Sequence, residues 1–184
     1  MRIVGGRLRG RGLAAPRSKE IRPTSDRLRE SLFNILAHGY GLPEQGTRVL
    51  DLFAGTGALG LEAISRGAAS ATFVETSVEA RGLIRTNIEA LGLTGVARIL
   101  RRDATDLGRA GTIAPFDLVF CDPPYGKVLA EAALASAASG GWLSPGALCV
   151  LEERADAAVE VPDGFALLDG REAGGSQLMF LRAA

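Results

Sequence analysis

The residues Asp122-Pro123-Pro124-Tyr125 follow a short apolar run, 116–121, that is typical of a buried parallel strand. Proline fixes φ and has no backbone N–H, so this backbone can neither continue as a helix nor pair as a strand. Open α/β sheets bind ligands at the carboxyl ends of their strands. Such a site suits a planar group that carries an NH2. The Asp122 carboxylate and the Pro123 carbonyl can accept its two hydrogens, while Tyr125 stacks on its face. The alternative is a Pro-Pro turn that only ends a strand.

A glycine-rich loop earlier in the chain indicates a nucleotide site. The run Gly55-Thr56-Gly57-Ala58-Leu59-Gly60 fits the pattern G-x-G-x-x-G and lies between an expected strand and an expected helix, as that fingerprint requires. Its glycines let the backbone approach a ligand and let the helix pack on the sheet. Glu75 comes twenty residues after Gly55, at the end of the next expected strand, where a carboxylate can hold ribose hydroxyls.

Two cofactors compete for this loop. A nicotinamide dinucleotide would place its pyrophosphate at the helix N-terminus, whereas S-adenosylmethionine carries an ammonium and a sulfonium that favour nearby acids. Asp51, four residues before Gly55, is unfavourable beside a pyrophosphate and favourable beside an ammonium, and Asp103 is placed after a third strand to accept from an adenine amino group. We therefore expect S-adenosylmethionine, bound by residues of the loop, the strand ends and the segment that introduces the first helix: Arg22, Thr24, Asp51, Phe53, Gly55, Gly57, Glu75, Asp103 and Ala104.

Alternating strand and helix patterns position these residues. A first helix, capped by Thr24 or Ser25, is expected over about 25–37. Strands are then expected over 49–53, 71–75, 96–100, 118–121 and 147–151, helices over 58–66, 77–91, 105–110 and 128–138, and a closing antiparallel pair over 165–168 and 178–181. This order predicts an α/β, doubly wound sheet of about seven strands in a single domain, 1–184, with a basic arm (1–22), an N-terminal helix (23–40) and a core (47–184).

Charge is distributed unevenly along a chain of 184 residues whose formal net charge is zero. Residues 1–30 hold nine Lys or Arg against three Asp or Glu, so this segment carries +6 and the remainder −6. A basic, Arg-Gly arm that is flexible or hairpin-like indicates a polyanionic partner; a solubilising tail is the alternative. The expected contacts are Arg7, Arg9, Arg11, Arg17, Lys19 and also Lys127, which touches a phosphate or lies solvated at a turn.

Other residue types narrow the class of protein. Cys121 and Cys149 lie in apolar runs, and no Cys/His cluster has metal-ligand spacing, so we expect reduced thiols, no metal and a cytoplasmic location. No stretch approaches 18 apolar residues and the first residues form no apolar signal, which argues against a membrane or secreted protein. The only histidine, His38, falls at the end of the first helix, where we expect a surface residue.

With these motifs, the chain resembles class I methyltransferases, and more narrowly the bacterial RsmD family of 16S ribosomal RNA guanine-N2 methyltransferases. The matching residues are 2–6, 9–10, 21–27, 32–36, 51–67 and 122–126, within a resemblance that covers about 2–153. The N-terminal block is the specific part, because Asp-Pro-Pro-Tyr also occurs in DNA amino-methyltransferases and in protein glutamine methyltransferases. The resemblance fades from Arg154 onward, and the segment 172–177 lacks the aromatic residue expected there.

The resemblance implies a Rossmann-like methyltransferase sheet and transfer of the sulfonium methyl group to the exocyclic N2 of an unpaired or flipped guanine. Asp122 and the Pro123 carbonyl would accept the hydrogens of the amine, so that its lone pair faces the methyl group, and Tyr125 would stack on the base. A tyrosine that only packs at the turn is the alternative. Cys121 should point away from the crevice when Asp122 points in, which argues against a covalent pyrimidine mechanism.

The partner implied is 16S rRNA within a small-subunit assembly particle, and we expect a monomer. Two other functions stay open. A DNA or protein-glutamine amino-methyltransferase would use the same pocket, although a protein substrate needs no Arg-Gly arm. A non-catalytic RNA-binding protein would explain the arm but not the pairing of Glu75 with Asp103.

Overall fold

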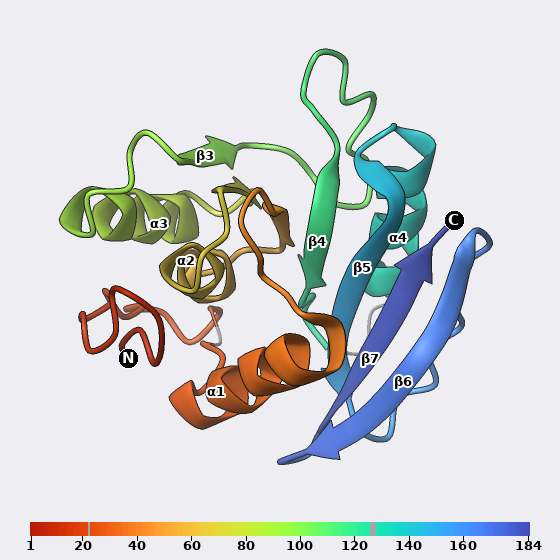
Figure 1. Cartoon of the computed structure of the whole chain (residues 1–184), viewed down its shortest axis with the longest axis horizontal. Helices are drawn as coiled ribbons and strands as arrows, with labels where there is room; N and C mark the ends of the chain where they lie inside the picture. The colour runs from red at the N-terminus through yellow and green to blue at the C-terminus, as the bar shows by residue number, and fades with distance from the viewer. Residues whose placement is uncertain (22, 126–127) are drawn as a thin grey trace.

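A seven-stranded sheet forms the centre of a computed structural model, which describes residues 1–21, 23–125 and 128–184 (Figure 1). The strand order is β3-β2-β1-β4-β5-β7-β6. Neighbours among β1 to β5 pair in parallel, and β7 pairs antiparallel with both β5 and β6. The predicted doubly wound sheet with a closing antiparallel hairpin is therefore confirmed. The strands are β1 (Arg48–Leu52), β2 (Ser70–Val74), β3 (Ala97–Leu100), β4 (Phe116–Cys121), β5 (Leu143–Arg154), β6 (Phe165–Ala173) and β7 (Ser176–Ala183).

Helices cover both faces of the sheet. The helices α1 (Asp26–Ile35), α2 (Ala58–Ser65) and α3 (Val78–Ala90) lie on one face, and α4 (Leu129–Ser139) lies on the other (Figure 1). A π-helical turn, η1 (Leu36–Tyr40), follows α1 directly. Ser25 caps α1 and Ser77 caps α3, because each hydroxyl accepts the backbone N–H three residues on. The sequence left Thr24 and Ser25 as alternative caps, and the structure selects Ser25.

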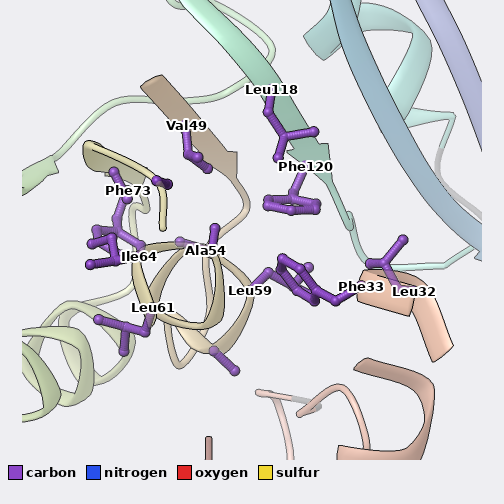
Figure 2. Close-up of a cluster of buried hydrophobic side chains, with 14 of the residues drawn as sticks. Leu32, Phe33, Val49, Ala54, Leu59, Leu61, Ile64, Phe73, Leu118 and Phe120 are labelled. Carbon is purple, nitrogen blue, oxygen red and sulfur yellow. The ribbon is translucent and has the colours of Figure 1, made fainter. Parts of the chain in front are cut away.

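The strands alternate between two hydrophobic clusters. On β4, Phe120 packs toward α1 and α2, whereas Cys121 packs toward α4. Figure 2 shows the first cluster, where Phe33 of α1 lies against Phe120 with the ring centroids 5.6 Å apart. Burial on both faces explains why these parallel strands are continuous apolar runs in the sequence.

The N-terminal segment is folded onto the body beside α1 and α2 (Figure 1). Arg2 and Gly12 form an isolated antiparallel bridge, so the segment is hairpin-like rather than free. Ile3, Leu8 and Leu13 are buried in the first cluster. Gly6 has a φ of 79°, and a Cβ there would lie 2.0 Å from the Ser65 carbonyl oxygen, so only glycine permits this approach to α2.

A buried carboxylate on α2 joins these elements. Glu62 accepts the backbone N–H groups of Val4 and Gly5, each at 2.9 Å, and forms ion pairs with Arg29 at 3.1 Å and Arg66 at 2.8 Å. The Glu62 and Arg29 side chains are fully buried. Arg29 also donates to the carbonyls of Thr24 and Arg2. One charged cluster therefore holds the N-terminal segment, α1 and α2 together.

One predicted helix is wrong. Residues 105–110 are not helical, because their backbone groups find partners outside the segment. The Leu107 N–H donates to the Ser136 hydroxyl at 2.8 Å, and the Ala110 N–H donates to the Gly140 carbonyl at 2.9 Å. The indole of Trp142 donates to the Gly108 carbonyl at 2.8 Å. The strands β5, β6 and β7 also extend further than predicted, because each is paired beyond its apolar run.

Both cysteines are free and buried, and burial raises the pKa of each thiol, that of Cys149 to about 12. Across the part of the chain that the structure describes, no helix is long and apolar enough to cross a bilayer. Within the same residues, no group of His, Cys, Asp and Glu has the arrangement of a metal site.

We expect Glu62→Ala to lower the free energy of unfolding by about 3–5 kcal/mol, because it removes the buried carboxylate beside Arg29 and leaves only the partly exposed Asp26 to pair with that buried charge. Glu30→Ala, on the exposed face of α1, is the matched control and should change stability by less than about 0.5 kcal/mol. Urea unfolding followed by circular dichroism measures both. Equal losses in the two variants would show that the Glu62 cluster adds no stability.

Candidate active site

A cavity of about 580 Å³ opens at the carboxyl ends of β1, β2, β4 and β5. This is the edge where doubly wound sheets bind ligands, and the volume suits a ligand of nucleoside size. The residues that line it come from the N-terminal segment, the glycine loop, the strand ends and the start of α4: Glu20, Ile21, Pro23, Thr24, Asp51, Phe53, Ala54, Gly55, Thr56, Ala58, Leu59, Glu75, Thr76, Ser77, Asp122, Pro123, Pro124, Tyr125, Leu129 and Glu152.

Strand parity brings three carboxyl groups to this cavity. Asp51 on β1 pairs with Phe120 on β4, and Phe120 pairs with Val150 on β5. Asp122 and Glu152 lie two residues beyond Phe120 and Val150, so they share the face of the sheet that carries α1 and α2. An acid from each of three neighbouring strands thus lines one cavity.

Asp51 is fully buried and accepts the Gly60 N–H at 3.0 Å. Burial, with a smaller contribution from the negative charge of Glu75, raises the pKa of its carboxyl to about 8. A carboxyl in this state favours a cationic ligand, because a nearby positive charge stabilises the ionised form. The ammonium group of S-adenosylmethionine fits that requirement.

The loop after β1 is shaped by unusual backbone angles. Gly55 and Gly57 have positive φ values of 58° and 79°. Phe53 also has a positive φ, 56°, which is strained for an aromatic residue and is typical of functional sites. A Cβ at Gly60 would lie 2.4 Å from the Phe73 ring, so this glycine allows α2 to pack closely on β2. Gly60 thus has the predicted role in helix packing, while the approach of the loop glycines to a ligand stays a prediction.

Glu75 follows β2 and anchors the same loop. Its Oε1 accepts the Gly55 N–H at 2.9 Å, and its Oε2 accepts the N–H groups of Thr76 and Ser77, both at 2.9 Å. A carboxylate offers about four acceptor positions. Glu75 therefore retains capacity for one ribose hydroxyl while it fixes the loop.

The Asp-Pro-Pro-Tyr motif is built around Asp122. Burial raises the pKa of the Asp122 carboxyl well above its usual range, and the adjacent Glu152 carboxyl raises it further by its like charge and by a hydrogen bond. The Thr24 hydroxyl donates to Asp122 Oδ2 at 3.2 Å. The Tyr125 hydroxyl donates to Glu152 Oε1 at 3.0 Å. The Ser176 hydroxyl donates to the same Glu152 oxygen at 3.0 Å, and the two hydroxyl oxygens lie 2.8 Å apart. The proximity of the two acids therefore opposes ionisation of Asp122.

The cavity gathers most, but not all, of the predicted site residues. Gly57 caps α2, and neither it nor Asp103 or Ala104 is among the lining residues. Asp103 is exposed and accepts from Thr105, while Ala104 is buried in the cluster beneath α4. The adenine contact of Asp103 stays a prediction. Arg22 and Lys127 lie outside the described residues.

The predicted RNA contacts on the N-terminal segment are all solvent-exposed: Arg7, Arg9, Arg11, Arg17 and Lys19. Arg11 also donates to the Ala90 carbonyl at 2.7 Å. His38 is exposed on η1, as expected for a surface residue. Cys121 is buried toward α4, as predicted from its parity relative to Asp122.

Sequence reasoning misses Glu152 and Ser176. Glu152 directly follows the expected strand 147–151. Because it lies two residues after Val150, it could have been placed on the same face of the sheet as Val150 from the sequence alone. Ser176 carries no signal of its own. It reaches Tyr125 only because β7 pairs antiparallel with β5, with Glu152 opposite Leu178.

Comparisons with known proteins agree with this fold and site. A family model described as "Conserved hypothetical protein 95" matches residues 1–182. The chain is 41% identical over 157 residues to ribosomal RNA small subunit methyltransferase D of Escherichia coli, covering 85% of this chain and 76% of that protein. It is 35% identical over 176 residues to the protein of the same name from Haemophilus influenzae, covering 95% and 89%. Among solved structures, the "Putative methyltransferase yhhF" of Escherichia coli superposes with a TM-score of 0.83 at 34% identity, covering 100% and 97% of the two chains.

Fold, glycine loop and relatives together define a class I methyltransferase, an enzyme that uses S-adenosylmethionine as its cofactor. The acid at the end of β1 and the positive-φ loop that follows it fit that cofactor. Within the class, the chain belongs to the RsmD family.

We expect the affinity for S-adenosylmethionine to rise with pH between about 6 and 7.5, by up to tenfold per unit. Asp51 has a pKa of about 8 in the free protein, so below that pH the bound ammonium must displace its proton. Titration calorimetry in buffers of different ionisation enthalpy should show about one proton released per cofactor bound at pH 7.

Asp51→Asn, which cannot ionise, should bind more weakly and with an affinity that is flat over the same pH range. A flat profile for the wild-type protein would remove the Asp51 carboxyl from contact with the ammonium.

Proposed function

We propose that this protein transfers a methyl group from S-adenosylmethionine to the exocyclic N2 of a guanine in 16S rRNA. The observation that carries the proposal is the half-buried Asp122 carboxyl, adjacent to Pro123 and to the ring of Tyr125 in the cavity that also contains the cofactor loop. Relatives named ribosomal RNA small subunit methyltransferase D support the RNA substrate. The cofactor supplies a methyl group on a positively charged sulfur.

The residues of the motif would prepare the amine for attack. The lone pair of a guanine N2 is delocalised into the ring, so the amine is a poor nucleophile. Asp122 and the Pro123 carbonyl accept its two hydrogens and favour a pyramidal nitrogen, while Tyr125 holds the base by stacking. Such positioning contributes up to roughly 7–11 kcal/mol. The same acceptors stabilise the positive charge that develops on the nitrogen.

The N-terminal segment would dock the RNA. Its basic side chains are exposed, while its apolar residues anchor it to α2, so the charges are presented from a fixed base. Glu20, Ile21, Pro23 and Thr24 line the wall of the cavity, and Thr24 contacts Asp122. We propose that the chain works in the cytoplasm as one methyltransferase domain and a monomer, on 16S rRNA within a small-subunit assembly particle.

The direct test offers labelled S-adenosylmethionine together with small-subunit particles, free 16S rRNA, DNA or total protein from cells that lack this protein. We expect label in the RNA, released by nuclease digestion as N2-methylguanosine, and mass mapping then locates the guanine. Label in a glutamine side chain would support the protein methyltransferase instead, and label in DNA would support the DNA enzyme.

We expect Asp122→Ala to bind S-adenosylmethionine nearly as well as the wild type but to lose more than nine tenths of kcat, because its contact with the amine matters mainly in the transition state. Single-turnover assays with saturating RNA measure the loss. Asp106→Ala, an exposed acid elsewhere on the chain, is the control and should keep full activity. A kcat above about a tenth of the wild-type value, a loss below ~1.4 kcal/mol, would make Asp122 a structural residue.

Neutralising the exposed charges of the N-terminal segment should weaken RNA binding without affecting the cofactor. For the triple variant Arg7→Gln, Arg9→Gln and Lys19→Gln we expect the slope of log K against log salt to fall by about 2–3, since each phosphate contact contributes about 0.7–0.9. Deleting the segment is a poor test, because Ile3, Leu8 and Leu13 belong to the core.

Three exposed arginines on other elements, replaced together as Arg98→Gln, Arg154→Gln and Arg171→Gln, provide a control of equal charge. Filter binding between about 50 and about 200 mM salt, a range over which proteins that contact several phosphates lose much of their affinity, compares the two variants. An equal change of slope in both would mean that the N-terminal segment is not the docking surface.

A further inference from the structure

Glu152 is a buried acid in the active site that the chemistry of methyl transfer leaves without a role. It is 9% exposed, lines the cavity and lies within hydrogen-bonding reach of Asp122. Both acids project from the same face of adjacent strands. The ligand that occupies this part of the cavity therefore meets two carboxyl groups side by side.

The position of Glu152 is fixed by hydroxyl groups. Tyr125 and Ser176 both donate to its Oε1, each at 3.0 Å, and these two hydroxyls lie 2.8 Å from one another. Both hydroxyl groups therefore hold the same carboxyl oxygen. They also fix the side chain from β7 on one side and from the Asp-Pro-Pro-Tyr motif on the other, so that Glu152 presents an acceptor at a defined place.

Two adjacent acceptors are complementary to one edge of one base. Guanine carries an N1–H donor directly beside its N2 amine, so the edge presents neighbouring donors. Adenine has an unprotonated N1 and cytosine an unprotonated N3 beside the amine, and a carboxylate would repel either lone pair. We propose that Glu152 accepts the N1–H of the target guanine while Asp122 accepts a hydrogen of its N2 amine, and that Glu152 thereby selects guanine. This assignment rests on the proposed function.

Ser176 is then a positioning residue. Its hydroxyl donates to Glu152 Oε1 and lies against the Tyr125 hydroxyl, so the hairpin β6–β7 reaches base recognition through Glu152. The hairpin needs no aromatic residue of its own for this role.

The test replaces the target guanine, once mapped, by 2-aminopurine in a particle assembled with a synthetic rRNA segment. This base keeps the amine that is methylated but has a lone pair at N1 in place of the hydrogen. We expect the wild-type kcat/KM to fall at least about 100-fold on this base, because buried polar groups that lose their partners discriminate strongly.

In Glu152→Gln the side-chain amide can either accept from guanine or donate to 2-aminopurine. The ratio of kcat/KM for guanine to kcat/KM for 2-aminopurine should therefore fall to within about tenfold. Comparing this ratio in the variant with the same ratio in the wild type cancels the difference in intrinsic reactivity between the amines of the two bases. Glu153→Gln, also buried but on the opposite face of β5, should keep the wild-type ratio. Ser176→Ala, which leaves Glu152 in place with one donor fewer, should give an intermediate ratio and replaces Glu152→Gln if that variant does not fold.

A wild-type enzyme that methylates 2-aminopurine within tenfold of guanine would overturn the assignment. An unchanged ratio in Glu152→Gln, or in Ser176→Ala where that variant replaces it, would do the same. Failure of the wild type to methylate guanine at all would instead overturn the proposed function, so the two failures are distinguishable.

Discussion

The carboxylate of Glu62 is the contact on which the geometry of the active site depends. It binds the backbone of the N-terminal segment and two arginines, and it is itself part of α2, the helix that begins at the cofactor loop. Arg29 extends the cluster to the Thr24 carbonyl, and the Thr24 side chain contacts Asp122. A charge buried in this way is stable only with its partners in place. The loop, the N-terminal wall of the cavity and the Asp122 carboxyl are thus held by one set of charges.

Three acids in one cavity would be unfavourable if they served stability alone, because burial and mutual repulsion oppose their ionisation. The structure offsets this with hydrogen-bond donors rather than with opposite charges: a backbone N–H for Asp51 and hydroxyls for Asp122 and Glu152. The raised pKa of Asp51 and of Asp122 follows from that choice. Each acid is therefore poised for a ligand that brings a positive charge or an N–H group.

Much of the fold is predictable from sequence because strands buried on both faces are apolar throughout, and helices begin at recognisable caps such as Ser77. Asp51, Glu75 and Asp122 are predictable too, since each lies at or just after the carboxyl end of a strand. The irregular loop over 105–110 is not predictable, because its hydrogen-bond partners come from Ser136 and beyond. The contact of Ser176 with Tyr125 is equally hidden, since it depends on strand register between segments 51 residues apart.

The placement of Ser176 has a consequence for the order in which the enzyme is assembled. During synthesis, the glycine loop, Asp122 and Glu152 are all made before β7. Until β7 pairs with β5, the Glu152 carboxylate lacks one of its two hydroxyl donors and β5 has an open edge. Such long-range pairing is slow, because the loop must close before its contacts form. A nascent chain can therefore complete its cofactor loop well before its base-recognition pocket, and the two sites mature at different times.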